Sequence, residues 1–99
     1  MPEYNIEFHP SAVDEAESAQ QWYAKRSKIA SIAFTNELSH AISKIIEAPS
    51  RWPKYHNNTR RYIFPRYPFS LVYRTKDNVI EVIAIMHQRR KPGYWVERK

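Results

Sequence analysis

Groups that could take part in acid–base chemistry follow directly after an apolar run near the end of the chain. They are His87, Arg89, Arg90, Lys91, Tyr94 and Trp95. Imidazole exchanges a proton near neutral pH, and guanidinium groups offer paired N–H donors to phosphate oxygens. Cleavage of RNA without a metal needs a base for the 2′-hydroxyl, an acid for the leaving oxygen and cations for the phosphate. These residue types could therefore act on a phosphodiester, or they could only close a strand and hold the tail.

One further arginine is a candidate for the same site. Arg60 and Arg61 are neighbours in a predicted strand, so their side chains face opposite ways. Only one of them can share a face with His87, and we expect this to be Arg61. The candidate catalytic set for an RNA-cleaving enzyme is His87, Arg61, Arg89, Arg90 and Tyr94, with Tyr94 stacking on a base or donating a proton.

A second set of residues could bind a target without acting on it. This set comprises Arg66, Lys91, Trp95, Trp52 and Tyr55. Trp52 and Tyr55 could form a base-stacking platform, although capping of the core below their loop is the preferred interpretation. Metal and cofactor sites are not expected, because the chain has no cysteine, its histidines lack metal-ligand spacing and it has one glycine.

The apolar run Val79–Met86 predicts the central strand of a sheet. Apolar residues occupy both alternation phases, with Ile80, Val82, Ala84 and Met86 on one side and Ile83 and Ile85 on the other. A strand with this pattern is covered on both faces, so it needs neighbours on both sides.

The remaining elements are predicted from periodicity and from turn residues. They are a strand over Tyr4–Phe8, a helix opened by a Ser11–Asp14 capping box, a helix over Lys28–Glu47 stopped by Pro49, strands over Arg60–Phe64 and Phe69–Arg74, and a tight turn at Lys76–Asn78. The fold class is therefore α+β: a two-layer β-α-α-β-β-β domain over residues 1–99 with a short tail.

The layers follow from the connections between these elements. An antiparallel helix hairpin covers one face of a mainly antiparallel four-stranded sheet, and the first strand joins beside the last. The other face is expected to stay open between the Trp52–His56 loop and the basic tail, where a ligand would bind.

Positive charge is confined to the second half of the chain. Residues 1–50 have four Lys or Arg and seven Asp or Glu, a net charge of −3, whereas residues 51–99 have twelve and three, a net charge of +9. This asymmetry favours a polyanionic partner, either nucleic acid or an acidic protein segment, over a merely solvated basic surface. With no cysteine, no membrane-spanning run and no signal-like start, we expect a cytoplasmic protein without a membrane partner.

The order of several short motifs resembles the RelE/ParE superfamily of bacterial type II toxins, in its plasmid-stabilisation branch. The motifs are His9-Pro10-Ser11-Ala12, Trp22-Tyr23, Ala33-Phe34, Tyr67-Pro68-Phe69 with Val72-Tyr73, and the ending His87-Gln88-Arg89-Arg90-Lys91-Pro92 with Trp95. The resemblance implies a growth-arresting toxin that is neutralised by a cognate antitoxin. No complete catalytic triad aligns with the RNA-cleaving members.

This resemblance leaves three functions open. RelE-like members cut messenger RNA on the ribosome, and ParE-like members inhibit DNA gyrase. A third alternative is a non-toxic antitoxin-binding partner that acts in operon autoregulation. Each implies an antitoxin with an acidic segment that is disordered when free.

Overall fold

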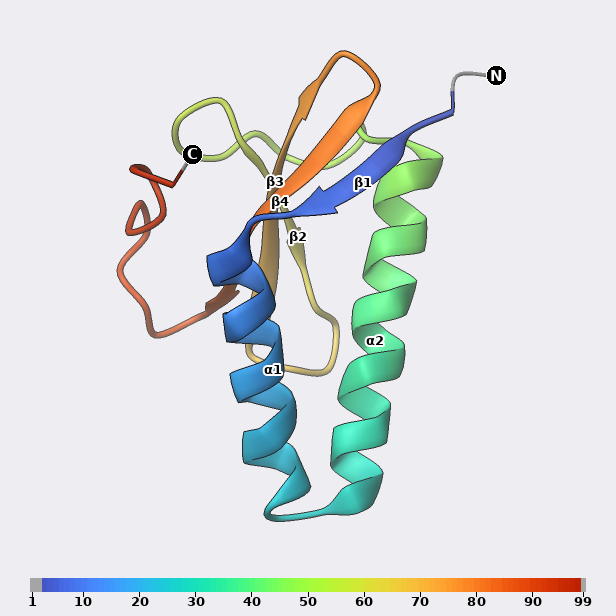
Figure 1. The fold of residues 1–99 in the computed structure, drawn as a ribbon, viewed down its shortest axis with the longest axis vertical. Coiled ribbons are helices and arrows are strands. Elements are labelled where there is room, and N and C mark those ends of the chain that lie inside the picture. Colours follow the sequence, from blue (N-terminus) through green and yellow to red (C-terminus); the bar gives the residue numbers. More distant parts are fainter. Residues whose placement is uncertain (1–2, 99) are drawn as a thin grey trace.

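The computed structural model describes residues 3–98, and the ends of the predicted domain, residues 1–2 and 99, lie outside this part (Figure 1). Its elements are β1 (Asn5–Phe8), α1 (Pro10–Ala24), α2 (Lys28–Glu47), β2 (Arg60–Ile63), β3 (Phe69–Lys76) and β4 (Val79–His87). The predicted α+β element order is confirmed.

The four strands form one sheet in the order β1-β4-β3-β2. β1 runs parallel to β4, with Asn5 opposite Val79, and the other two pairings are antiparallel. The predicted central position of the last strand is therefore confirmed, as is the placement of the first strand beside it. The tight turn contains Asp77 at φ 55°, a left-handed conformation that aspartate tolerates better than most residues.

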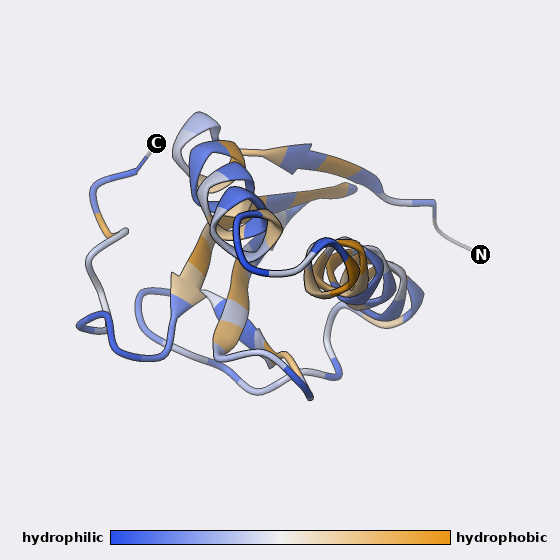
Figure 2. Cartoon of the chain, turned by 90° about the horizontal axis from the view of Figure 1, so that it is seen from below, coloured by the Kyte–Doolittle hydropathy of each residue, from blue (hydrophilic) through white to orange (hydrophobic). Residues whose placement is uncertain are grey.

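The helix hairpin covers one face of the sheet, and the two helices run antiparallel (Figure 1). Phe34 and Ile45 of α2 are buried together with Leu71, Ile80 and Val82 of the sheet. Apolar segments, coloured orange, lie both in the strands and in α2 (Figure 2).

The first helix does not begin with the predicted capping box. His9 is its N-cap, and the Nδ1 atom of His9 accepts the backbone N–H of Ser11 at 3.0 Å. Pro10 occupies the first turn, where its missing N–H costs no helical hydrogen bond and its fixed φ suits the helix. The prediction that Ser11 caps the helix is therefore wrong, because the cap lies two residues earlier, at His9.

A bulge in β4 changes which side chains share a face. Val72 pairs with Ala84 and Tyr73 pairs with Val82, so Ile83 is an extra residue on β4. The predicted alternation holds for Ile80 and Val82, which face the helices, and fails beyond them. Ala84 and Met86 pack with Ile83 on the other face, whereas Ile85 returns to the helix-facing core.

The face opposite the helices is not open, contrary to expectation. Val72, Ile83, Ala84 and Met86 form a second buried cluster with Trp95 of the tail. Tyr55 stacks on the Trp95 ring with centroids 5.3 Å apart. The tail and the loop after α2 therefore meet over the face that they were expected to leave free. Within residues 3–98, neither helix is long and apolar enough to cross a membrane.

Replacement of Trp95 by alanine is expected to destabilise the protein by about 3–5 kcal/mol, because the cavity adds to the lost burial. The Trp95 side chain is 2% exposed. Urea unfolding followed by circular dichroism would measure the change. Val96→Ala, at a neighbouring side chain that is 46% exposed, is the control. Equal effects of the two substitutions would show that the tail does not pack on the sheet.

Candidate functional site

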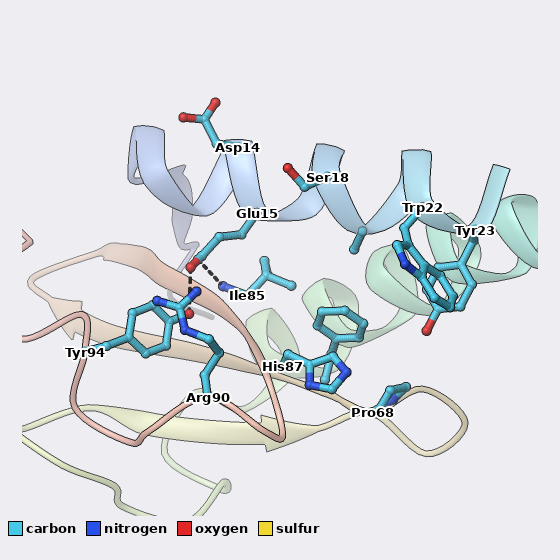
Figure 3. A pocket seen from close by; sticks show the side chains of 12 residues that line it. Asp14, Glu15, Ser18, Trp22, Tyr23, Pro68, Ile85, His87, Arg90 and Tyr94 are labelled. Atoms are coloured by element: carbon cyan, nitrogen blue, oxygen red, sulfur yellow. Dashed lines mark hydrogen bonds between the residues drawn. The ribbon is translucent and has the colours of Figure 1, made fainter. Parts of the chain in front are cut away.

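A groove lies between α1 and the end of β4, with a volume of about 510 Å³ (Figure 3). Its apolar lining consists of Ala19, Trp22, Tyr23, Pro68, Phe69 and Ile85, and its polar lining of Asp14, Glu15, Ser18, His87, Arg90 and Tyr94. Trp22 and Tyr23 reach from the helix toward Pro68 and His87 (Figure 3). The groove therefore brings three predicted site residues, His87, Arg90 and Tyr94, to one place.

Glu15 closes the edge of β4 beside this groove. β1 pairs with β4 only as far as Val82, and the His9 N–H donates to the Val82 C=O where α1 leaves the sheet. Beyond that point, Glu15 Oε1 accepts the Ile85 N–H at 3.0 Å, and Arg98 Nη1 donates to the Ile83 C=O at 2.9 Å. Two side chains thus bond backbone groups that a neighbouring strand would otherwise satisfy.

The same carboxylate fastens the tail. Arg98 reaches Glu15 Oε1 at 2.8 Å and Oε2 at 2.9 Å, and the Tyr94 hydroxyl donates to Oε2 at 2.6 Å. Both side chains of the ion pair are 17% exposed, so water screens it less than an ordinary surface pair. Burial, together with the hydrogen bond to Glu15, raises the pKa of Tyr94. The bond to Glu15 likewise raises the pKa of Arg98.

One ring nitrogen of His87 is bonded within the chain. Its Nδ1 atom accepts the Arg89 N–H at 3.0 Å, so the neutral ring bears its proton on Nε2. The ring packs edge-on against Phe69 with centroids 5.0 Å apart. In this tautomer, the nitrogen that is not bonded within the chain can donate a hydrogen bond but cannot accept a proton.

Arg61 does not share a face with His87, so the expectation that it would is wrong. It pairs with Val72, and its guanidinium lies 4.2 Å from the centre of the Tyr55 ring, over the face covered by the tail. Arg60, the rejected alternative, donates to the Trp52 C=O at 2.6 Å. Arg61 and His87 lie on opposite faces because the bulge at Ile83 turns His87 toward the helices.

The other predicted cations are dispersed around the groove. Arg90 lies 3.8 Å from the centre of the Tyr94 ring and lines the groove, whereas Arg89 and Lys91 are exposed outside it. Arg66 lies at the β2–β3 turn, where its backbone N–H donates to Glu37 Oε1 at 2.9 Å. The five candidate catalytic residues are therefore not assembled into one site.

All three predicted binding aromatics serve in packing. Trp95 is buried, so its ring is covered rather than presented to a base. Trp52 packs edge-on against Tyr62 with centroids 4.8 Å apart, as expected of a residue that caps the core. Tyr55 lies between Arg61 and Trp95, so both its ring faces are in use.

Sequence reasoning missed Glu15, Trp22 and Arg98 as site residues. Glu15 falls three residues after Ala12 and four before Ala19, so helical spacing places it on the inward side of α1. A carboxylate on the buried side of a helix is unusual, so the position of Glu15 could have marked it as a site residue. Nothing local marked Arg98, whose partner lies 83 residues away. Within the described residues, no group of three or more His, Cys, Asp or Glu could hold a metal ion.

Removal of one partner of the Glu15–Arg98 pair is expected to cost about 2 kcal/mol, because the other charge stays partly buried. Glu15→Ala, Arg98→Ala and the double variant form a cycle that chemical denaturation can measure. The double variant should be less destabilised than the sum of the single variants, since the lost interaction is counted twice in that sum. Additive losses would show that the tail is not held by this pair.

Alkaline pH is expected to destabilise the protein through Tyr73 and Tyr94. Burial raises the pKa of Tyr73 to about 12, and the pKa of Tyr94 is also raised. The folded chain therefore retains protons on these tyrosines that the unfolded chain releases above about pH 10. Their contribution to the free energy of unfolding is fully present below that pH and is lost as the pH rises above it. Urea unfolding at about pH 9 and about pH 11 should show this fall, and Tyr94→Phe should reduce it. An identical fall in the variant would remove Tyr94 from the explanation.

Comparison with known proteins identifies the family of the chain. A search of curated protein sequences finds no match. Among solved structures, one from the "Chromosomal ParDE TA system from P. aeruginosa" is similar, with a TM-score of 0.75 and 12% identity over 88% of this chain and 98% of that chain. At this identity the similarity establishes the fold alone. The family described as "ParE toxin of type II toxin-antitoxin system, parDE" matches residues 6–92, most of the chain. The chain therefore belongs to the ParE toxin family of type II toxin–antitoxin systems.

Proposed function

We propose that this toxin arrests growth by binding DNA gyrase and that it does not cut messenger RNA. The observation that carries the proposal is the state of His87. Its Nδ1 atom is bonded to the Arg89 N–H, and Arg61 lies over the opposite face of the sheet. A metal-independent ribonuclease needs a base and phosphate-binding cations around one reacting group. An inhibitor that acts by binding needs only a surface.

The surface proposed for gyrase is the outer side of the tail. Arg89, Lys91 and Val96 of the tail are exposed, and the buried Trp95 fixes the tail to the sheet. Arginine side chains over a rigid support are common among the residues that dominate protein interfaces. The role expected of Trp95 thus becomes positioning of this surface rather than contact with the target.

The proposed regulator is the antitoxin, through a segment that is acidic and disordered when free. The basic second half of the chain supports this chemistry, since an acidic segment would be attracted to it before contact. Because gyrase acts on the chromosome, the proposal places the toxin in the cytoplasm. The non-toxic operon regulator is the alternative that a silent target assay would favour.

Purified toxin is expected to inhibit supercoiling of relaxed plasmid by gyrase. His87→Gln should inhibit as well as the parent protein, because its imidazole has no chemical role. The double variant Arg89→Gln, Lys91→Gln should be severalfold weaker, because it removes both exposed cations of the proposed surface.

A translation reaction with mapped messenger 5′ ends serves as the opposing test. No new ends are expected when toxin is added. New ends that require ribosomes, and that His87→Gln abolishes, would overturn the proposal in favour of the ribonuclease. Silence in both assays would leave the non-toxic partner as the function.

A further inference from the structure

We propose that the covered face of the sheet binds the phosphate backbone of duplex DNA through Arg61 and Arg90. This surface, called the tail face, is formed by the tail and by the loop that carries Tyr55, where both cover the second buried cluster. The choice of duplex DNA rests on the proposed function, since gyrase acts on DNA and a bound inhibitor would lie close to it. The anion-binding chemistry of the two arginines does not depend on that function.

Both arginines are held over aromatic rings while their N–H donors remain free. The Arg61 guanidinium lies 4.2 Å from the centre of the Tyr55 ring, and the Arg90 guanidinium lies 3.8 Å from the centre of the Tyr94 ring. Within residues 3–98, neither guanidinium donates a hydrogen bond to the protein or pairs with a carboxylate. A guanidinium supported by a ring keeps its donors in a fixed plane, which suits the oxygens of a phosphate.

The other arginines that lie over aromatic rings are already bonded. These are Arg26, Arg51 and Arg98. Arg26 donates from Nη1 to a backbone carbonyl at 2.9 Å, whereas Arg51 and Arg98 form ion pairs at 3.5 and 2.8 Å. Among residues 3–98, Arg61 and Arg90 are therefore the two ring-supported arginines that remain free to bind an anion.

One row of packed rings joins these two arginines. Tyr55 stacks on Trp95 with centroids 5.3 Å apart, and Trp95 meets Tyr94 edge-on with centroids 5.6 Å apart. Arg61 and Arg90 thus lie at the two ends of the row and are held in place by it. Each strand of DNA carries a phosphate every ~3.4 Å along the helix axis, so a single duplex can present phosphates to both ends.

The surface between the two arginines favours a polyphosphate over an acidic peptide. The Trp95 side chain is 2% exposed, so it is not available as an anchor for the apolar side chain of a peptide. Arg89 and Lys91 are exposed beside Arg90 in the chain, and Glu97 is the only acid among residues 88–98. Cations without a large apolar anchor meet the requirement of sequence-independent DNA binding.

Asp14 restricts the site to the tail side of Arg90. Asp14 and Glu15 of α1 line the groove that Arg90 also borders (Figure 3). Glu15 is already in an ion pair, but the exposed Asp14 has no such partner within residues 3–98 and therefore repels phosphate from the groove. DNA is accordingly expected to lie over the tail rather than in the groove, beside the surface proposed for gyrase.

Binding of a fluorescein-labelled duplex of about 20 base pairs tests the proposal, by fluorescence anisotropy at roughly 50 to 200 mM salt. The slope of log K against log salt concentration should be about −2 to −4. Arg61→Gln and Arg90→Gln should each reduce the magnitude of this slope by about one, because each removes a phosphate contact. Arg61→Lys keeps the charge and should restore the slope, which separates a lost contact from a lost fold.

The matched control is Arg26→Gln, which removes an equal charge from a ring-supported arginine between α1 and α2. It should leave the slope unchanged. Polyglutamate with the same total charge should displace the labelled duplex much more weakly than unlabelled duplex does, and an RNA duplex should bind no more tightly than DNA. Absence of saturable binding at low salt, equal effects of Arg26→Gln and Arg61→Gln, equal displacement by polyglutamate, or tighter binding of RNA would each overturn the proposal.

These assays contain no gyrase, so they separate this inference from the proposed function. A toxin that binds DNA through these arginines but leaves gyrase unaffected would retain the DNA site and remove gyrase as the target. A toxin that inhibits gyrase but does not bind DNA would lose only the DNA site.

Discussion

The structure depends on how the central strand is completed where its parallel neighbour stops. β1 ends at Phe8 because His9-Pro10 begins a helix, which leaves the second half of β4 without a strand on that side. Exposed backbone groups at a sheet edge must be satisfied or protected. Glu15 from α1 and Arg98 from the tail bond the Ile85 N–H and the Ile83 C=O. This one ion pair therefore joins the sheet, the first helix and the tail.

The bulge at Ile83 distributes the side chains around that junction. It turns Ala84 and Met86 to the face that Trp95 covers, and it turns His87 toward α1. Bulges of this kind redirect side chains at the cost of one ladder position. β4 therefore contributes side chains to two separate buried clusters and still places His87 in the groove at its end.

The tail contributes both to the groove and to the surface proposed for the target. Tyr94 and Arg90 line the groove, whereas Arg89 and Lys91 are exposed outside it.

The sequence by itself determined the elements, the sheet order, the superfamily and the basic second half, because periodicity, turn residues and short connections are local signals. Only the tertiary structure decided which face each side chain takes after Ile83, since a bulge leaves no mark in an apolar run. It also decided that the tail covers the second face and that Glu15 meets Arg98. Such long-range pairings depend on where α1 lies against the sheet, and no spacing along the chain encodes that position.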